Sequence, residues 1–477
     1  MKVLFAASEG SPFVKTGGLG EVVGYLPRAL KKQGVEARVV LPKYEGIDPF
    51  FKEKMEFQGD ITVPVGWRNQ YCGIYKQEHL GVTFYFLDNE YYFKRPGPYG
   101  YGDEGERFAY FSRAVLECLP LLDFTPQILH LHDWPTAVVS PLLQAHYGHK
   151  SFYQDMRTLL TIHNLHYQGV FPKEILGDLL SLGWDYFKAD ALEFYDHVNF
   201  LKGGIIFSDY LSTVSKTYAW EIQTPFFGEG LDDLLRDRKD RLYGIINGID
   251  YEIYDPMIDP EVFVPYRRSL SKKQANKVKL QEMLGLEQDK EAPLIAFVNR
   301  MVKQKGLDLI LHVFDEIMSL GVQVAVLGTG DPRYEDFFRG AAFRYPGRVS
   351  ASILFDDSLS RKIYAGSDMF LMPSLFEPCG LSQLIALRYA SIPIVRETGG
   401  LGDTVKPYDE KIKEGNGFSF TNYNAHDMLY TINRAVTFYR DKKTWARIFL
   451  NALEGDYSWN RSAREYRDLY QLMLEKR

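Results

Sequence analysis

The chain contains the same local pattern twice: an apolar run, a turn, an amphipathic stretch and a second apolar run. In the first copy the runs are residues 3–7 and 37–41, and residues 17–33 between them carry an apolar stripe at helical spacing. Continuous apolar runs of this length are typical of strands buried on both faces of a parallel sheet. The pattern therefore predicts strand–helix–strand units, and with them an α/β fold built on doubly wound sheets.

The second copy begins far along the chain, at the predicted strand 294–298. Predicted strands of the first half are 82–87, 128–131, 159–162 and 211–214, with helices at 104–119 and 135–147. In the second half a helix at 307–320 and strands at 322–327, 369–372 and 392–395 follow. The segment 247–291 is polar and carries a charged helix. Because 477 residues exceed what one core usually holds, we expect two domains, residues 1–245 and 246–457.

Composition excludes several classes of protein. A formal net charge of -6 argues against a dedicated nucleic-acid binder. Three cysteines without a Cys-x-x-Cys pair indicate neither a disulfide scaffold nor a zinc site. The first apolar run is too short for a secretory signal, and no stretch approaches the ~18 apolar residues of a membrane span. We therefore expect a cytoplasmic protein without a membrane contact.

A glycine-rich loop follows the first predicted strand, Lys15-Thr16-Gly17-Gly18-Leu19-Gly20. Adjacent glycines let backbone amides approach an anion, and the helix that follows adds the positive end of its dipole. The loop matches neither the dinucleotide-binding nor the Walker pattern, so a plain glycine turn remains an equal alternative. A second glycine-rich turn, residues 399–403, follows the predicted strand 392–395 and proves little by itself.

Charged residues follow two strands of the second half. Arg300 and Lys305 lie just past the strand 294–298, where two cations suit a diphosphate leaving group. Lys303 competes with them, and a solvated basic turn is the common alternative. Glu377 precedes a Pro-Cys-Gly turn after the strand 369–372; it can accept sugar hydroxyl groups or simply favour a helix N-terminus.

Two histidines follow strands of the first half, His132 and His163. Their spacing is not that of zinc ligands, and single histidines at strand ends are more often structural than catalytic.

Together these segments resemble the bacterial glycogen synthase and plant starch synthase family, over nearly the whole chain. The resemblance rests on the motifs Lys15–Gly20, His132–Trp134, Thr161–Gly169, Asn247–Asp250, Arg300 with Lys305, and Phe376–Gln383. It implies the GT-B architecture, in which two Rossmann-like domains face a deep interdomain cleft. It also implies that a C-terminal helix, residues 458–477, packs back on the first domain.

The resemblance assigns roles to single residues. On the donor side, Arg300 and Lys305 hold the diphosphate with Lys15 and Gly18. Glu377 and the backbone of Cys379, Gly380 and Leu381 hold the glucose, and Phe355 lies against the adenine. His163 and Asn247 border the glucose. The acceptor-side residues implied are Glu9, Asp133 and Phe93, although Phe93 stands where the family often has Tyr and therefore cannot offer a hydroxyl contact.

The implied reaction is retaining transfer of glucose from ADP-glucose to the non-reducing 4-hydroxyl of an α-1,4-glucan such as glycogen or starch. No carboxylate nucleophile is implied, so positioning and charge stabilisation would provide the catalysis, with neither a metal nor another cofactor. Where many related retaining transferases have a second glutamate, this chain has Ile385.

Alternatives remain. They are a UDP-glucose donor, a glucan phosphorylase, a small-acceptor transferase and a non-catalytic glucan-binding protein. Nothing in the chain suggests the pyridoxal phosphate lysine or the added length of a phosphorylase. Lys15, Arg300, Lys305 and Glu377 are all intact, which argues against a non-catalytic binder.

Overall fold

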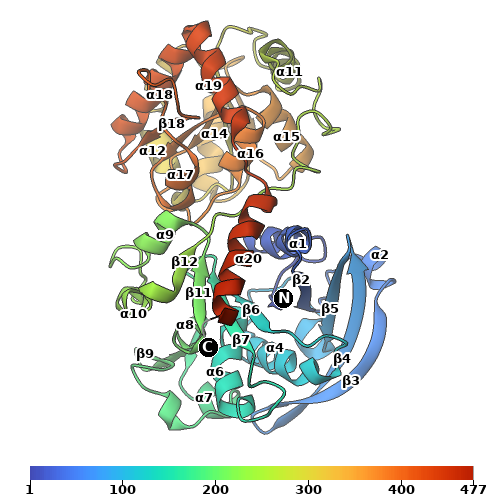
Figure 1. Ribbon diagram of the computed structural model, residues 1–477. Coiled ribbons are helices and arrows are strands. Elements are labelled where there is room, and N and C mark those ends of the chain that lie inside the picture. The colour runs from blue at the N-terminus through green and yellow to red at the C-terminus, as the bar shows by residue number, and fades with distance from the viewer. Residues whose placement is uncertain (476–477) are drawn as a thin grey trace. The chain divides into compact units, whose positions relative to one another are not determined.

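A computed structural model describes residues 1–475 of the chain (Figure 1). The chain divides into two compact units. Unit 1 is Met1–Asn247 with the chain from Trp459 onward, and unit 2 is Gly248–Ser458. The boundaries lie two residues and one residue from the ones expected at 245 and 457. No helix among the described residues is long and apolar enough to cross a membrane.

Unit 1 is built on a nine-stranded sheet of order β12-β11-β7-β6-β1-β2-β5-β4-β3. Neighbours from β12 to β5 run parallel, whereas β4 is antiparallel to β5 and β3 is antiparallel to β4. The strands are β1 (Lys2–Ala6), β2 (Glu36–Pro42), β3 (Glu56–Val65), β4 (Arg68–His79), β5 (Val82–Asp88), β6 (Ile128–His132), β7 (Arg157–Ile162), β11 (Tyr210–Thr213) and β12 (Leu242–Gly244).

A second, three-stranded sheet of order β8-β10-β9 lies in the same unit. Its strands are β8 (Val170–Pro172), β9 (Glu193–Phe194) and β10 (His197–Asn199). The helices of unit 1 are α1 (Gly18–Lys31), α2 (Pro49–Lys52), α3 (Glu90–Phe93), α4 (Glu104–Cys118), α5 (Trp134–Ala137), α6 (Val139–Leu142), α7 (Ile175–Asp178), α8 (Phe200–Phe207), α9 (Lys216–Glu221), α10 (Asp232–Asp237) and α20 (Trp459–Glu475).

The first strand–helix–strand unit forms as its apolar pattern predicts. In β1, residues 3–6 have no exposed surface, and α1 buries Val22, Val23, Leu26 and Leu30 completely. The C-terminal helix α20 packs on α1 within unit 1 (Figure 1). Its Tyr470 hydroxyl lies 2.8 Å from His130 Nδ1, which ties the helix to the centre of the sheet.

Unit 1 differs from the sequence expectation in several places: the short strands β8, β9, β10 and β12 were not predicted, and two larger features also differ. The hairpin β3–β4 was not predicted, because β3 is largely exposed and lacks a continuous apolar run. The single helix expected at 135–147 is instead α5, α6 and a π-helical turn, Leu143–Tyr147. Pro141 lies within this stretch, and a proline cannot donate the backbone hydrogen bond that a continuous helix needs.

Unit 2 is built on a six-stranded parallel sheet of order β15-β14-β13-β16-β17-β18. The strands are β13 (Leu294–Val298), β14 (Gln323–Leu327), β15 (Val349–Ser352), β16 (Met369–Met372), β17 (Ile392–Arg396) and β18 (Phe418–Phe420). The helices are α11 (Leu270–Met283), α12 (Leu307–His312), α13 (Phe314–Ser319), α14 (Pro332–Arg344), α15 (Asp357–Gly366), α16 (Ser382–Arg388), α17 (Gly399–Thr404), α18 (Ala425–Arg440) and α19 (Lys442–Glu454).

The strands predicted in both units lie within two residues of their observed bounds. β15 and β18 were missed, since both are short and half of β15 is serine. The helix expected at 307–320 is interrupted at Val313 and forms α12 and α13.

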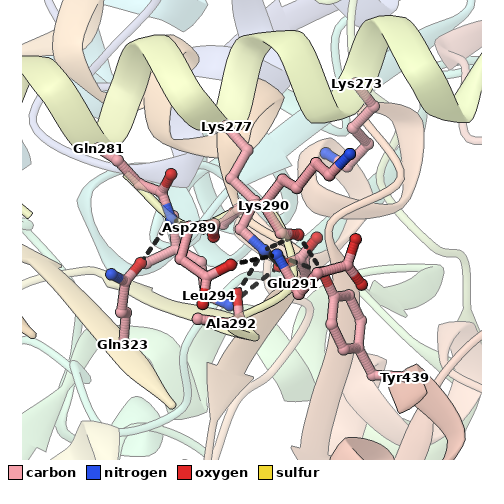
Figure 2. A network of polar contacts seen from close by, with 12 residues as sticks. Lys273, Lys277, Gln281, Asp289, Lys290, Glu291, Ala292, Leu294, Gln323 and Tyr439 are labelled. Carbon is pink, nitrogen blue, oxygen red and sulfur yellow. Dashed lines mark hydrogen bonds and ion pairs between the residues drawn. The ribbon is translucent and has the colours of Figure 1, made fainter. Parts of the chain in front are cut away.

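The charged helix α11 turns a polar face inward (Figure 2). Lys273, Lys277 and Gln281 recur every four residues and are all buried. Lys277 Nζ lies 2.7 Å from Asp368 Oδ2, at the start of β16, and donates to the Tyr439 hydroxyl at 2.9 Å. Lys273 donates to the carbonyls of Tyr364, Ala365 and Tyr389 at 2.9–3.1 Å. These carbonyls end α15 and α16, so the Lys273 amine donates to two helix C-termini, which favour its charged form, whereas its burial opposes that form.

Candidate active site

The loop after β1 is organised by Glu9. This carboxylate is only 4% exposed, and its Oε1 accepts hydrogen bonds from Thr16 Oγ1 and Tyr99 Oη, each at 2.8 Å. Its Oε2 accepts the Thr16 backbone N–H. We expected Glu9 to face the acceptor. In this structure its carboxylate instead holds the Lys15–Gly20 loop in place, with Tyr99 as a partner that the sequence pattern does not reveal.

The tip of this loop is open. A side chain at Gly17 or Gly18 would meet nothing within 4 Å, and no side chain caps the N-terminus of α1. The Lys15 ammonium pairs with Glu21 in the first turn of α1, and its side chain is 47% exposed. An open glycine tip, an uncapped helix of 14 residues and an accessible cation suit the binding of a phosphate group.

A row of histidines crosses the carboxyl ends of β6 and β7. His132 Nδ1 lies 2.9 Å from His163 Nε2, and His130 Nε2 lies 2.6 Å from Thr161 Oγ1. Burial lowers the pKa of His163 to about 3 and holds that of His132 well below its ordinary value. Both rings are therefore neutral near pH 7, and one of them donates the proton that they share. His132 positions the ring of His163, a link that spacing in the sequence does not show.

Asp133 has a left-handed backbone, with φ at 56°. A non-glycine residue in this region is uncommon. Its Oδ1 accepts the His163 backbone N–H at 2.7 Å. Burial raises the Asp133 pKa to about 7, Glu9 adds to the rise, and the backbone N–H groups of His163 and Asn164 oppose it. Asp133 thus connects the ends of β6 and β7 and titrates near neutral pH.

Two further residues of unit 1 differ in accessibility from what their predicted roles require. Phe93 has no exposed surface, and its ring packs against Tyr44 at 5.5 Å and Tyr110 at 6.0 Å. The expectation that Phe93 contacts the acceptor is therefore wrong for this structure: the phenyl ring lacks a hydroxyl group and is part of the core. Asn247, at the end of unit 1, is 5% exposed, and its Oδ1 has no hydrogen-bond partner among the described residues.

In unit 2, glycines fix the loop that carries Arg300 and Lys305. Gly306 has φ at 74°, and a Cβ there would lie 2.0 Å from the Pro373 carbonyl oxygen. Gly328 and Gly330 follow β14 and approach this loop just as closely. A Cβ at Gly328 would lie 1.9 Å from the carbonyl oxygen of residue 299, and one at Gly330 would lie 2.3 Å from that of residue 301. Only glycine permits these close backbone contacts, which hold the loop against its neighbours at the carboxyl edge of the sheet.

The two predicted cations of this loop differ in environment. Arg300 is exposed, and its guanidinium makes no ion pair with any residue the structure describes. Lys305 is buried: its Nζ lies 2.6 Å from Glu377 Oε2, and each side chain is 9% exposed. Ser374 Oγ donates to the same Glu377 oxygen at 3.1 Å. The structure thus brings Lys305 and Glu377 together and adds Ser374, which sequence reasoning missed. Lys303 is exposed.

The Glu377–Leu381 turn rests on the second glycine-rich segment. A Cβ at Gly399 would lie 2.0 Å from the Glu377 carbonyl oxygen, and one at Gly400 would lie 2.0 Å from that of Cys379. The Gly400 N–H donates to the Pro378 carbonyl at 3.0 Å. This segment is therefore a support for the turn. Gly380 has φ at 73°, a backbone conformation that favours glycine, and a Cβ there would lie 2.3 Å from Gln383 Oε1 of α16.

Phe355 follows β15 and is 91% exposed, so its ring is available to a planar ligand. Among residues 1–475, no group of three or more His, Cys, Asp or Glu side chains is arranged to hold a metal ion. The polar groups at the carboxyl ends of β13 and β16 in unit 2 thus include the cations Arg300, Lys303 and Lys305, the carboxylate of Glu377 and the hydroxyl of Ser374, a set suited to a phosphorylated sugar.

Comparison with protein families agrees with this chemistry. Residues 2–237 match the family model described as starch synthase catalytic domain, and residues 281–447 match glycosyl transferases group 1. The two matches fall in unit 1 and unit 2 respectively.

Similar proteins are found along the full length. A glycogen synthase of Desulforamulus reducens is 57% identical over 475 residues, covering 99% of each chain. The structure of the catalytic domain of starch synthase IV from Arabidopsis thaliana, bound to ADP and acarbose, has a TM-score of 0.91 at 35% identity. It covers 100% of this chain and 99% of the other. A sucrose-phosphate synthase from Thermosynechococcus elongatus shares the fold, with a TM-score of 0.63 at 15% identity.

Proposed function

We propose, since the chain belongs to the glycogen synthase and starch synthase family of GT-B glycosyltransferases, that it transfers glucose from ADP-glucose to the non-reducing end of an α-1,4-glucan. The observation that carries this proposal is the buried Lys305–Glu377 pair at the carboxyl edge of the unit 2 sheet. Arg300, on the same loop as Lys305, is exposed and has no ion-pair partner among the described residues. Full-length similarity to a glycogen synthase and to a starch synthase structure bound to ADP supports it.

Unit 2 would bind the donor. Arg300 offers two parallel N–H groups to the diphosphate, and Lys305 adds a charge that Glu377 holds in one orientation. Glu377 retains a second oxygen for a glucose hydroxyl group. The backbone of Cys379, Gly380 and Leu381 would complete the glucose site, and the exposed ring of Phe355 would stack on the adenine.

Unit 1 would contribute further donor and acceptor contacts. Lys15 and the tip at Gly18 suit the phosphates, because a side chain at Gly18 would meet nothing within 4 Å and the Lys15 side chain, which pairs with Glu21, is still 47% exposed. His163, held neutral and oriented by His132, would donate or accept a hydrogen bond at a sugar hydroxyl without adding charge. Asp133 fixes the His163 backbone, and Asn247 has an unpaired amide oxygen for the glucose.

The chemistry balances without an enzymic nucleophile. The bond from the glucose anomeric carbon to the diphosphate oxygen breaks, and the acceptor 4-hydroxyl oxygen bonds to that carbon on the same face. The hydroxyl proton passes to the departing diphosphate, and ADP leaves. Arg300 and Lys305 stabilise the negative charge that grows on the leaving group, which is the principal barrier-lowering effect available here. In this scheme Glu377 positions the glucose, and its charge is already countered by Lys305.

The proposal is tested by following radiolabelled glucose from ADP-glucose into glycogen, with UDP-glucose in parallel and EDTA present. Strong preference for ADP-glucose would support the donor, the reaction and independence of metal ions together. Transfer only from UDP-glucose would replace the donor, and transfer that stops with EDTA would contradict metal independence. With neither donor active, a non-catalytic glucan-binding role would take its place.

A further inference from the structure

One helix of unit 2 turns polar side chains into the protein interior. Lys273, Lys277 and Gln281 lie on one face of α11, and all three are buried (Figure 2). We call these three residues the α11 row. A lysine is rarely buried unless it is paired, so the partners of the row are informative. The reaction proposed above uses none of the three.

Lys273 joins the ends of two helices. Its Nζ donates to the carbonyls of Tyr364 and Ala365, in the last turn of α15, at 3.1 and 3.0 Å. It also donates to the Tyr389 carbonyl, which ends α16, at 2.9 Å. Tyr266 Oη donates to the same Tyr389 carbonyl at 2.7 Å. One amine therefore fixes how far apart the two helix ends lie.

The opposite ends of both helices carry residues of the proposed donor site. Phe355 lies just before α15, whose N-cap Asp356 accepts the Leu359 N–H at 2.9 Å. The Glu377–Leu381 turn leads directly into α16. A helix is stiff and rises about 1.5 Å per residue, so a tilt or shift at one end is carried along its length to the other.

Both helices depend on tertiary contacts for their position. α15 has 10 residues and α16 has 7. Isolated helices shorter than about 12–15 residues are marginal in water, so packing has to hold these two in place. α15 lies so close to α11 that a Cβ at Gly366 would lie 2.7 Å from Leu280 Cδ2. The contacts with α11 are therefore a principal support of α15.

The next residue of the α11 row reaches the amino edge of the sheet. Lys277 Nζ lies 2.7 Å from Asp368 Oδ2, and the same oxygen accepts the Leu294 N–H at 2.9 Å. Asp368 precedes β16, and Leu294 begins β13. The carboxyl ends of these neighbouring strands lead to Glu377 and Lys305. The α11 row thus holds, at their far ends, both the helices and the strands that carry proposed donor residues.

We propose that Lys273 is a positioning residue of the donor site: by joining the C-terminal ends of α15 and α16, it sets the spacing between Phe355 and the Glu377–Leu381 turn. This inference rests on the proposed function, in which these two segments hold opposite ends of ADP-glucose. If the spacing varies, binding of a ligand that spans both segments must also restrict the helices, and its affinity decreases. Lys273 therefore affects KM for ADP-glucose more than kcat.

Two variants test the role. Lys273→Met removes all three hydrogen bonds and keeps an unbranched side chain, whereas Tyr266→Phe removes only the second donor to the Tyr389 carbonyl. KM for ADP-glucose should rise about tenfold in Lys273→Met and about threefold in Tyr266→Phe, with kcat within about twofold of the wild type. Tyr266→Phe keeps the ring and leaves Lys273 on the carbonyl, so it folds and carries the test if Lys273→Met does not.

Two controls separate positioning from a general loss of stability. Lys279→Met alters an exposed lysine of the same helix and should change neither KM nor kcat. Val436→Ala truncates a buried side chain on α18, which packs on β17 and β18. It should lower stability by leaving a cavity and should keep the wild-type KM.

Amide hydrogen exchange separates failure of the positioning role from failure of the proposed function. Without nucleotide, exchange in α15 and α16 should be about tenfold faster in Lys273→Met than in the wild type, and unchanged in α18. If exchange responds in this way but the wild type transfers no glucose from ADP-glucose, Lys273 still sets the spacing and the proposed function falls. Unchanged exchange in both helices, or an unchanged KM in a variant that transfers glucose, would overturn the positioning role.

Discussion

Lys305 Nζ lies 2.6 Å from Glu377 Oε2, although the two residues are 72 positions apart and each side chain is 9% exposed. Lys305 follows β13 and Glu377 follows β16, and these strands are neighbours in the parallel sheet of unit 2. A cation and a carboxylate that leave water together hold each other in a single orientation. Under the proposed function, the pair would therefore already be organised to present one charge to a diphosphate and one oxygen to a sugar.

Removing either predicted diphosphate ligand should slow transfer strongly. We expect Arg300→Ala and Lys305→Ala each to lower kcat by about 100-fold or more, because the leaving-group charge loses a partner in the transition state. Steady-state transfer to glycogen measures the effect. Lys303→Ala is the matched control, since Lys303 is exposed on the same loop and should retain near-normal activity. Near-normal rates in both Arg300→Ala and Lys305→Ala would refute the assignment.

Lys305→Ala also leaves the Glu377 carboxylate buried without its cation, so it should lower the melting temperature. Adding Glu377→Gln should restore much of this stability, because the uncompensated buried charge is then gone. Activity should stay low in the double variant. Recovery of activity along with stability would mean that Lys305 acts only through folding.

The glycine at the end of the cation loop should be indispensable. Gly306→Ala combines a left-handed backbone with a Cβ 2.0 Å from the Pro373 carbonyl oxygen. The backbone strain alone costs about 1–3 kcal/mol, and the clash displaces the loop that carries Lys305. The free energy of unfolding, measured with urea, and kcat should both decrease. Gly340→Ala is the control: this glycine lies in α14 with open space around it, and alanine should stabilise the helix by about 1 kcal/mol.

Asp133 should give stability a defined pH dependence. Its folded-state pKa is about 7, raised above the ordinary value of 3.8. The folded protein therefore holds a proton that the unfolded chain has lost between these values, and this contribution to stability disappears as the pH rises through 7. Asp133→Asn keeps the acceptor for the His163 N–H and should lose less stability between pH 5 and pH 8 than the wild type. Urea midpoints at the two pH values measure this.

Asp185→Asn is the control for that experiment, since its side chain is 93% exposed and its pH profile should follow the wild type. His163 is neutral in the folded protein throughout this range, whereas in the unfolded chain it titrates near its ordinary pKa of 6.5. This contribution to stability is common to the wild type and Asp133→Asn, so it cancels in the comparison. Identical profiles for wild type and Asp133→Asn would show that Asp133 does not titrate near neutral pH.

Lys273 should affect the pH dependence of stability in the opposite direction to Asp133, and at higher pH. Burial lowers its pKa from 10.5 to about 7, with Lys277 adding to the shift and Asp368 opposing it. Between these values the unfolded chain binds the proton and the folded protein does not, so stability rises with pH and falls as the pH drops through 7. Lys273→Met should remove this rise between pH 7 and pH 10, as followed by chemical denaturation.

Lys279→Met, on the exposed side of the same helix, should keep the wild-type slope and serves as the control. A slope in Lys273→Met equal to that of the wild type would show that Lys273 stays protonated, held by the helix ends it contacts (Figure 2).

The sequence by itself determined the fold class, the two-domain division and the family, because those depend on local patterns. Buried parallel strands need uninterrupted apolar runs, and the glycine-rich turns that follow them can be recognised from composition alone. The strands at 294–298 and 369–372 were predicted to the residue. The charged residues that follow them were found for the same reason, since they directly follow such strands.

Only the tertiary structure decided which of these residues meet. Three contacts join segments that are far apart in the sequence, so no local pattern predicts them. They are the pairing of Lys305 with Glu377, the orientation of His163 by His132, and the hydrogen bonds by which Glu9 holds its loop. Burial also decided against Phe93 as an acceptor contact, and Lys273 and Lys277 of α11 are turned inward. These outcomes depend on long-range packing, in which the environment of a side chain is set by neighbours that local propensity cannot specify.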